Sequence, residues 1–345
     1  MNYIGSKLSL MDFLKEEIMA TLKSEGDLRT FEELVFADGF AGTGIVGTEF
    51  KKMGFSVISN DIQYYSYVMT RHFIENSEEL FKNWVQNPFE LLNNIEPVEG
   101  FIYYNYSLGG TKGSEFERMY FTDENAKKCD AIRMEIEKWK NEKRITNDEY
   151  FYLLASLINS IDKVANTASV YGAFLKNYKK SALQPLILQP LEIVLSSKHN
   201  KSYNLPIEDW IRQVEGDILY LDPPYNERQY CSNYHMLETI AKYDNPIVKG
   251  KTGLRDYKEQ KSDWCSKSKV CNVFEELISN AKFKYIFLSY NNEGLMSLED
   301  VERIMTKYGT YRLATKKYRR FKADNERFNK ADSTFEYLHC LIKID

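Results

Sequence analysis

Hydrophobic positions near the start of the chain predict a helix followed by alternating strands and helices. Apolar residues recur every four positions, as on one face of an amphipathic helix, at Leu10, Leu14, Ile18 and Leu22. Short apolar runs at 34–37 and 56–59 read as strands, and the segment between them, 45–53, has helical character. The order strand, turn, helix, strand predicts the opening of a doubly wound α/β sheet.

Helical spacing then dominates the middle of the chain, and strand patterns return later. From about residue 101 to 195 the pattern is mainly helical. Strands are predicted again at 218–221, 285–288, 310–319 and 334–344. The last two alternate in polarity and predict an antiparallel pair. We therefore expect one α/β core, formed by residues 1–100 and 196–345, with a helical insertion at 101–195.

Composition limits the class of protein. Of 345 residues, 43% are hydrophobic and 28% are charged, which excludes wholesale disorder. The first residues lack the apolar core of a signal peptide, and no apolar run reaches the ~18–20 residues of a membrane span. We therefore expect a cytoplasmic protein with no membrane partner.

Cysteine and histidine give no sign of a metal site. The five cysteines form no C-x-x-C pair, and the four histidines are scattered. We expect reduced thiols and no bound metal. The formal net charge of −4 points, taken alone, slightly away from nucleic acid.

A glycine-rich turn follows the first predicted strand. Residues 38–47 contain a G-x-G-x-x-G pattern at Gly42, Gly44 and Gly47. Glycines let a ligand approach the backbone, and the next helix presents its N-terminal amides. Asp61 ends the second predicted strand, where a carboxylate can accept both ribose hydroxyls. The spacing favours a nucleoside-containing cofactor over an empty turn and leaves NAD and S-adenosyl-L-methionine (SAM) both open.

The segment Asp222-Pro223-Pro224-Tyr225 directly follows another predicted strand. Proline cannot continue a strand ladder and fixes φ near −65°, so the tetrapeptide forms a rigid platform beyond the strand. It offers the Asp222 carboxylate, the Pro223 carbonyl and the aromatic face of Tyr225. Because an exocyclic amine needs acceptors and a planar ring needs a stacking surface, the segment indicates an aminated base rather than a plain turn.

Together these motifs resemble the alpha-group, Dam-like N6-adenine DNA methyltransferases. Four segments occur in that family's order, at 2–7, 38–44, 60–61 and 222–225. The resemblance covers the first ~75 residues and most of the chain from about 200 onward. It implies a Rossmann-like SAM-dependent methyltransferase fold, with 101–195 as an inserted target-recognition region.

The same resemblance implies a cofactor site and a catalytic site. The cofactor-binding residues that it implies are Tyr3, Lys7, Asp38, Phe40, Gly42, Gly44, Asp61 and Asp222. Tyr3 stands where the family often has Trp, which is a conservative change. The implied catalytic residues are Asp222, Pro223, Pro224 and Tyr225, with Asp222 between cofactor and target amine and Tyr225 stacking on the base.

A basic segment near the end of the chain is the candidate for phosphate contact. Six cations with no acid among them lie in eleven residues, at Arg312, Lys316, Lys317, Arg319, Arg320 and Lys322. The alternative is a solvated basic hairpin. In a DNA enzyme, contact with duplex DNA is the favoured interpretation.

The expected activity is methyl transfer from SAM to N6 of an adenine flipped out of double-stranded DNA. We expect a modification enzyme of a restriction system, a monomer or weak dimer, with a cognate endonuclease acting separately. N4-cytosine or RNA exocyclic-amine methylation is the nearest alternative. A nicotinamide-dependent dehydrogenase would leave 222–225 unexplained, and a non-catalytic nucleotide- or DNA-binding protein remains open. Cytosine-C5 chemistry is disfavoured because no Pro-Cys pair occurs.

Overall fold

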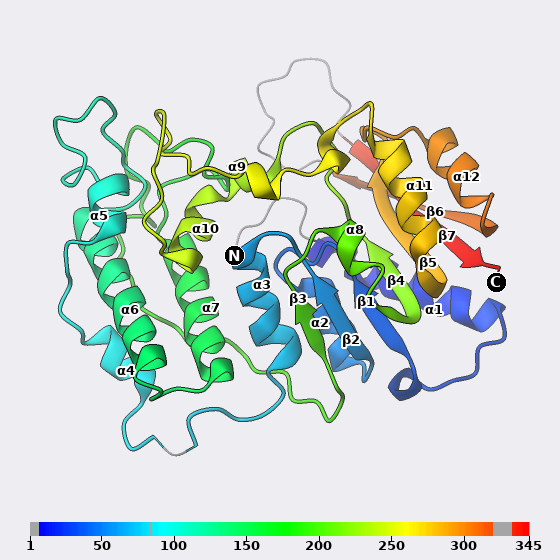
Figure 1. Ribbon diagram of the computed structural model, residues 1–345, viewed down its shortest axis with the longest axis horizontal. Helices are drawn as coiled ribbons and strands as arrows, with labels where there is room; N and C mark the ends of the chain where they lie inside the picture. Colours follow the sequence, from blue (N-terminus) through cyan, green and yellow to red (C-terminus); the bar gives the residue numbers. More distant parts are fainter. Residues whose placement is uncertain (1–6, 83, 320–332, 345) are drawn as a thin grey trace. The chain divides into compact units, whose positions relative to one another are not determined.

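Seven strands of the chain form a single mixed sheet, seen in the ribbon of Figure 1. This computed structural model describes residues 7–82, 84–319 and 333–344. Of the described residues, those within 7–62, 196–229 and 260–344 form a sheet unit, and those within 63–195 and 230–259 form a helical unit. Within the described ranges, no helix has both the length and the apolar character that crossing a bilayer requires.

The order of the strands in the sheet is β3-β2-β1-β4-β5-β7-β6. Their bounds are β1 Val35–Asp38, β2 Ser56–Asn60, β3 Lys201–Tyr203, β4 Glu215–Leu221, β5 Lys282–Asn291, β6 Gly309–Arg319 and β7 Ser333–Lys343. Neighbouring strands from β3 to β5 pair in parallel, and β7 runs antiparallel to both β5 and β6. The predicted α/β class, Rossmann-like fold and antiparallel C-terminal pair are confirmed.

Helices cover both faces of this sheet. The helices and short turns of the sheet unit are η1 Lys7–Leu10, α1 Met11–Ser24, η2 Phe31–Glu33, α2 Ile45–Lys52, α8 Ile207–Trp210, η5 Asp263–Cys265, α11 Val270–Asn280 and α12 Leu298–Met305. A further turn, η4 Lys258–Gln260, spans the boundary between the units. The amphipathic stripe predicted for α1 is confirmed, since Leu14 and Ile18 are fully buried.

Strand alternation decides which side chains meet which helices. On one face, which we call the α1 face, Phe36 of β1 stacks on Phe50 of α2, and Cys340 of β7 lies 3.8 Å from the Thr21 hydroxyl of α1. The opposite face, which we call the α11 face, packs α8, α11 and α12 over Leu219, Leu288 and neighbouring residues. Because side chains alternate along each strand, Glu336 shares the α1 face with Cys340.

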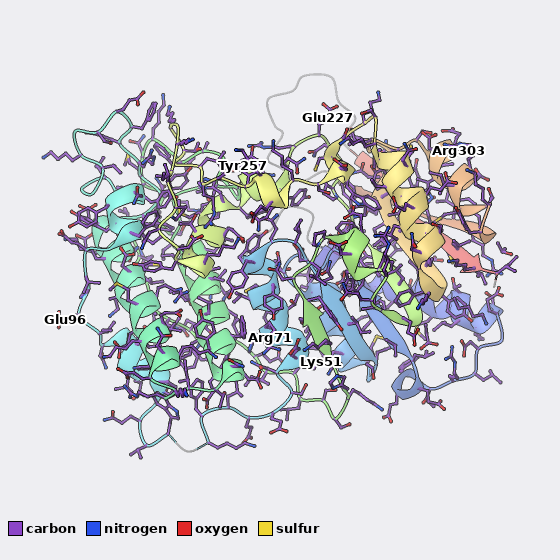
Figure 2. All side chains as sticks on the ribbon, in the orientation of Figure 1. Lys51, Arg71, Glu96, Glu227, Tyr257 and Arg303 are labelled. Atoms are coloured by element: carbon purple, nitrogen blue, oxygen red, sulfur yellow. The ribbon has the colours of Figure 1, made fainter. Side chains whose placement is uncertain are left out.

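The helical unit has its own hydrophobic core. Its helices are α3 Tyr64–Thr70, the π-helical turn η3 Arg71–Glu75, α4 Pro88–Asn93, α5 Phe101–Tyr106, α6 Asp123–Asn141, α7 Asn147–Lys163, α9 Tyr230–Asn233 and α10 His235–Lys242. Apolar side chains from α3, α6, α7 and α10 fill the core. Arg71, labelled in Figure 2, joins η3 to α7 by a 3.1 Å contact with Asp148 and by lying over the Phe151 ring.

The bounds of this unit differ from those expected for the insertion. The expected insertion began at residue 101, whereas the helical unit already includes the chain from residue 63 and also takes in 230–259. The reason is packing. Tyr65 and Val68 of α3 are fully buried in the helical core, and the Tyr65 amide donates to Glu238 of α10 at 3.0 Å.

Candidate active site

The glycine turn between β1 and α2 is held in a left-handed conformation. Gly42 and Gly44 have φ values of 54° and 78°, a region that other residues rarely adopt. Two bonds tie the turn to the end of β2, because the Ala41 amide donates to the Asn60 carbonyl and the Gly42 amide donates to Asp61 Oδ2, at 3.0 and 2.8 Å. The turn therefore lies at the carboxyl ends of β1 and β2, as the sequence predicted.

Asp38, the last residue of β1, is a buried carboxylate. It is 1% exposed, and neither of its carboxylate oxygens has a side-chain hydrogen-bond partner among the described residues, while the backbone amides of Gly47 and Phe40 favour its ionised form. Burial, followed by the negative charge of Asp222, raises the pKa of Asp38 to about 8. A buried acceptor of this kind is suited to a ligand that brings its own N–H donors.

Asp61 is placed beside the turn by neighbouring backbone. Its amide donates to the Tyr203 carbonyl of β3, and the Asn204 side chain donates to the Asp61 carbonyl at 2.7 Å. Asn204, for which the sequence suggested no role, therefore helps to hold the backbone of Asp61 in place.

Asp222 and the two prolines follow β4 directly. Oδ1 of Asp222 accepts from the Lys7 ammonium at 3.1 Å and from the Tyr225 hydroxyl. Among the described residues, no donor reaches Oδ2 of Asp222 or the Pro223 carbonyl. One carboxylate oxygen and one carbonyl are thus left as acceptors on the platform.

Lys7 lies between two carboxylates. Its ammonium contacts Glu336 Oε1 at 2.7 Å in addition to Asp222, and it also donates to the Tyr225 hydroxyl. Burial disfavours the charged form of Lys7, but Asp222 and Glu336 outweigh it and raise the pKa of Lys7. Burial also raises the pKa of Asp222 and of Glu336, against the opposing charge of Lys7.

The ring of Tyr225 is fixed from two sides. The Lys7 ammonium lies 4.9 Å from its centroid, and Tyr290 of β5 meets it edge to face at 5.3 Å. Tyr290 is held in turn by the backbone amide of Leu295, which donates to its hydroxyl at 3.0 Å. Stacking of Tyr225 on a base stays a prediction.

The sites predicted from sequence meet in one place, with two qualifications. The residues at the carboxyl ends of β1, β2 and β4 are Asp38, Phe40, Gly42, Gly44, Asp61, Asp222, Pro223, Pro224 and Tyr225. Lys7 contacts Asp222 and Tyr225, and its expected role in the cofactor pocket stays a prediction. Tyr3 lies outside the described residues. Phe40 meets Trp264 edge to face at 5.1 Å.

The predicted DNA-binding cations do not share one face of β6. Arg312 donates to Ser24 and Glu25 of α1, at 2.5 and 2.6 Å, and the Lys316 ammonium lies 5.5 Å from the Phe13 ring of α1. By strand alternation Lys317 lies on the opposite face, and it is exposed. Arg319 ends β6, whereas Arg320 and Lys322 lie outside the described residues.

Sequence reasoning missed Glu336 and left Tyr290 without a role. A signal for Glu336 exists, because it is the one acid in the alternating run of 334–344, and its face of β7 is otherwise apolar at Leu338, Cys340 and Ile342. An acid at such a position implies a buried partner. Nothing local identifies that partner as Lys7, which is 329 residues away.

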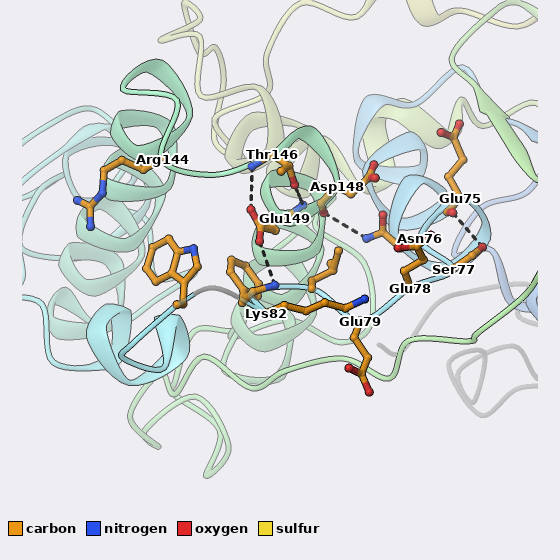
Figure 3. Close-up of a pocket in the computed structure, with 13 residues that line it drawn as sticks. Glu75, Asn76, Ser77, Glu78, Glu79, Lys82, Arg144, Thr146, Asp148 and Glu149 are labelled. Carbon is orange, nitrogen blue, oxygen red and sulfur yellow. Dashed lines mark hydrogen bonds between the residues drawn. The ribbon is translucent and has the colours of Figure 1, made fainter.

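A cavity of about 550 Å³ lies elsewhere, within the helical unit. Figure 3 shows it between the segment that follows η3 and the start of α7, where Glu149 accepts from the amides of Thr146 and Phe81. At the edge of the cavity, the Arg144 guanidinium lies over the Trp84 ring. None of the predicted site residues lines it.

Comparison with known proteins gives consistent matches. A family model described as D12 class N6 adenine-specific DNA methyltransferase matches residues 3–304. Type II methyltransferase M.NlaIII of Neisseria lactamica is 52% identical over 345 residues, with 99% of each chain covered. Type II methyltransferase M.FokI of Planomicrobium okeanokoites is 43% identical over 99% of this chain, and modification methylase StsI of Streptococcus sanguinis is 39% identical over 96%. The chain spans about half the length of these two, 53% and 50%.

Proposed function

Because the chain belongs to the D12 class N6 adenine-specific DNA methyltransferase family, we propose that the cluster at the ends of β1, β2 and β4 is its active site. There it transfers a methyl group from SAM to N6 of an adenine flipped out of duplex DNA. The single observation that carries this assignment is a pair of acceptors to which none of the described residues donates, Asp222 Oδ2 and the Pro223 carbonyl.

These acceptors match the chemical difficulty of the reaction. The amino nitrogen of adenine is a poor nucleophile, because its lone pair is delocalised into the ring. Hydrogen bonds from both N–H groups to Asp222 and Pro223 favour a tetrahedral nitrogen with a localised lone pair. They strengthen as the nitrogen gains positive charge, so they act mainly in the transition state.

The residues around the glycine turn fit SAM. The buried carboxylate of Asp38 suits the ammonium of the methionine part of SAM, and Asp61, beside the glycine turn, would accept the ribose hydroxyls. When bound, SAM supplies an electrophilic methyl group on a sulfonium. Asp61 and Asp222 present negative charge to this cationic ligand, and the ammonium of SAM favours the ionised form of Asp38.

Transfer of label to DNA tests the assignment. Incubation with tritiated methyl-SAM and unmethylated duplex DNA, followed by digestion to nucleosides, is expected to place the label in N6-methyldeoxyadenosine. Label in N4-methyldeoxycytidine would instead identify the protein as an N4-cytosine methyltransferase. No transfer to DNA of varied sequence would contradict the proposal, provided that SAM shifts the melting temperature of the same preparation.

We also propose that the protein is the modification enzyme of a restriction system, with a separate cognate endonuclease. The similarity to modification methylase StsI supports this role. DNA methylated by the protein is then expected to resist cleavage by an endonuclease of the same recognition sequence. Cleavage of fully methylated DNA at the unmethylated rate would argue against the pairing.

Duplex DNA is proposed to contact the exposed cation Lys317 of β6 and the helical unit, the expected target-recognition region. Lys317→Ala is expected to lower the slope of log K against log salt by about one, because one phosphate contact is lost. Arg312→Ala is the matched control, since Arg312 already pairs with Glu25. Equal slopes for wild type and Lys317→Ala would remove Lys317 from the interface.

A further inference from the structure

Glu336 is a buried acid in the active site that none of the sequence motifs contains. It is 2% exposed and lies on the α1 face of β7, where its register partners are Asn291 of β5 and Lys316 of β6. The Lys316 ammonium lies over Phe13, so Lys7 is the cation that pairs with Glu336. Burying a carboxylate costs folding free energy, and a buried ion pair often gives no net stability in return. We therefore looked for a role of Glu336 in the reaction.

The Lys7 ammonium is saturated by its three neighbours. An ammonium group has three N–H donors, and those of Lys7 go to Glu336 Oε1, Asp222 Oδ1 and the Tyr225 hydroxyl. The Tyr225 hydroxyl in turn donates to Asp222 Oδ1 and lies 3.3 Å from Glu336 Oε1. The Lys7 ammonium and the Tyr225 hydroxyl therefore both donate to the same oxygen of Asp222, Oδ1.

We infer that Glu336 is a positioning residue for methyl transfer: it holds the Lys7 ammonium on Oδ1 of Asp222, which leaves Oδ2 to the target amine. The inference rests on the proposed function of Asp222. Without the second carboxylate, the ammonium would be drawn to Asp222 alone and one of its three donors would lose its partner.

Charge is the second part of this role. The groups that face Glu336 are Lys7 from η1, Asp222 and Tyr225 after β4, and Tyr220 of β4, whose hydroxyl donates to Ser289. Two carboxylates around one ammonium leave a local charge of −1. Burial lowers the pKa of Lys7, whereas the charges of Asp222 and Glu336 raise it. Removing the charge of Glu336 leaves Asp222 alone against burial, so the pKa of Lys7 falls.

The test is the pH dependence of kcat in Glu336→Gln, which keeps the shape of the side chain and removes its charge. Between pH 7 and 9.5, wild-type kcat is expected to stay level, because the pKa of Lys7 lies above this range. In the variant, kcat is expected to fall at least about twofold over the same range, because removing the charge of Glu336 lowers the pKa of Lys7 and half-ionisation halves the ammonium population. A purely structural role would lower kcat equally at every pH. That result, or an unshifted profile, would overturn the inference.

A double-mutant cycle tests whether Glu336 acts through Lys7. In a Lys7→Met background Glu336 has lost its cation, so Glu336→Gln is expected to change kcat less than about twofold or to raise it. In the wild-type background the same substitution is expected to lower kcat at least about tenfold at pH 8. Equal losses in both backgrounds would contradict an action through Lys7.

Two further variants keep the result interpretable. Glu336→Asp retains the charge and is expected to keep the wild-type pH profile even if its kcat is lower. It replaces Glu336→Gln as the test variant if Glu336→Gln does not fold. Glu215→Gln removes an exposed carboxylate of β4, 3.9 Å from Lys282, and is expected to match wild type throughout. A shifted pH profile in Glu336→Asp would contradict the role of charge.

Failure of this inference is distinguishable from failure of the proposed site. If Asp222→Ala is inactive and Glu336→Gln keeps the wild-type kcat and pH profile, only the role of Glu336 is lost. If Asp222→Ala retains turnover, the active site itself has been misplaced, whatever Glu336→Gln shows.

Discussion

Replacing Asp222 by alanine is expected to lower kcat for methyl transfer by at least about 100-fold while the protein remains folded. The variant removes the Oδ2 acceptor and leaves the Pro223 carbonyl alone on the platform. Because the lost hydrogen bond strengthens as the amine becomes positive, kcat should fall far more than the KM for DNA changes. Single-turnover rates with labelled SAM measure the chemical step directly.

The structure suggests two companions for this measurement. Asp222→Asn keeps an acceptor oxygen but loses the charge, so its rate is expected between those of wild type and Asp222→Ala. Asp209→Ala, an exposed position on α8, is the matched control and should stay within about twofold of wild type. Wild-type single-turnover rates in a folded Asp222→Ala protein would rule out Asp222 as the acceptor.

Replacing Asp38 by asparagine is expected to weaken SAM binding while stabilising the ligand-free protein. Loss of a charge-assisted hydrogen bond to the SAM ammonium corresponds to about 1.5–3 kcal/mol, or roughly 10–150-fold in Kd. Calorimetric titration of SAM measures this loss. The thermal shift that SAM produces should shrink in parallel.

The gain in stability follows from the pKa of Asp38, which is raised to about 8 from its ordinary value of 3.8. Between these values the native state holds a proton that the unfolded chain has released, so the free energy of unfolding falls as pH rises. Asparagine removes this dependence. We expect a gain of about 2–4 kcal/mol at pH 8, which shrinks as pH falls and vanishes below about pH 3, where both states are protonated.

Melting temperatures across this pH range check the prediction. Asp12→Asn changes an exposed acid in the first turn of α1 and serves as the control, with no SAM-dependent effect expected. An Asp38→Asn protein that melts lower than wild type at pH 8 and binds SAM normally would show that Asp38 is a structural residue. Lower stability together with lost binding would point to disruption of the turn.

Much of the fold was accessible from local patterns. The turn after β1 needs glycine at Gly42 and Gly44, because both have positive φ, and the prolines after β4 end its ladder. Alternation also located the β6–β7 pair. These features depend on backbone preferences of single residues, so they can be read without knowing what packs against them.

Other features depended on packing that no local pattern describes. Helix α3 follows β2 directly, yet Tyr65 and Val68 bury themselves in the helical core, so the unit begins at residue 63 rather than 101. The six cations near the end of the chain form one cluster in sequence. In the structure Arg312 and Lys316 face α1, and Lys317 faces the other way.

By itself, the sequence determined the α/β class, the glycine turn, the Asp222–Tyr225 platform and, through them, the chemistry of an exocyclic amine. Only the tertiary structure decided that Lys7 contacts both Asp222 and Glu336, and that none of the described residues donates to Oδ2 of Asp222. The physical reason is that a motif requires particular residues at short spacing, whereas an ion pair across 329 residues depends on sheet order and strand register. Those are properties of the whole sheet and cannot be read from either residue alone.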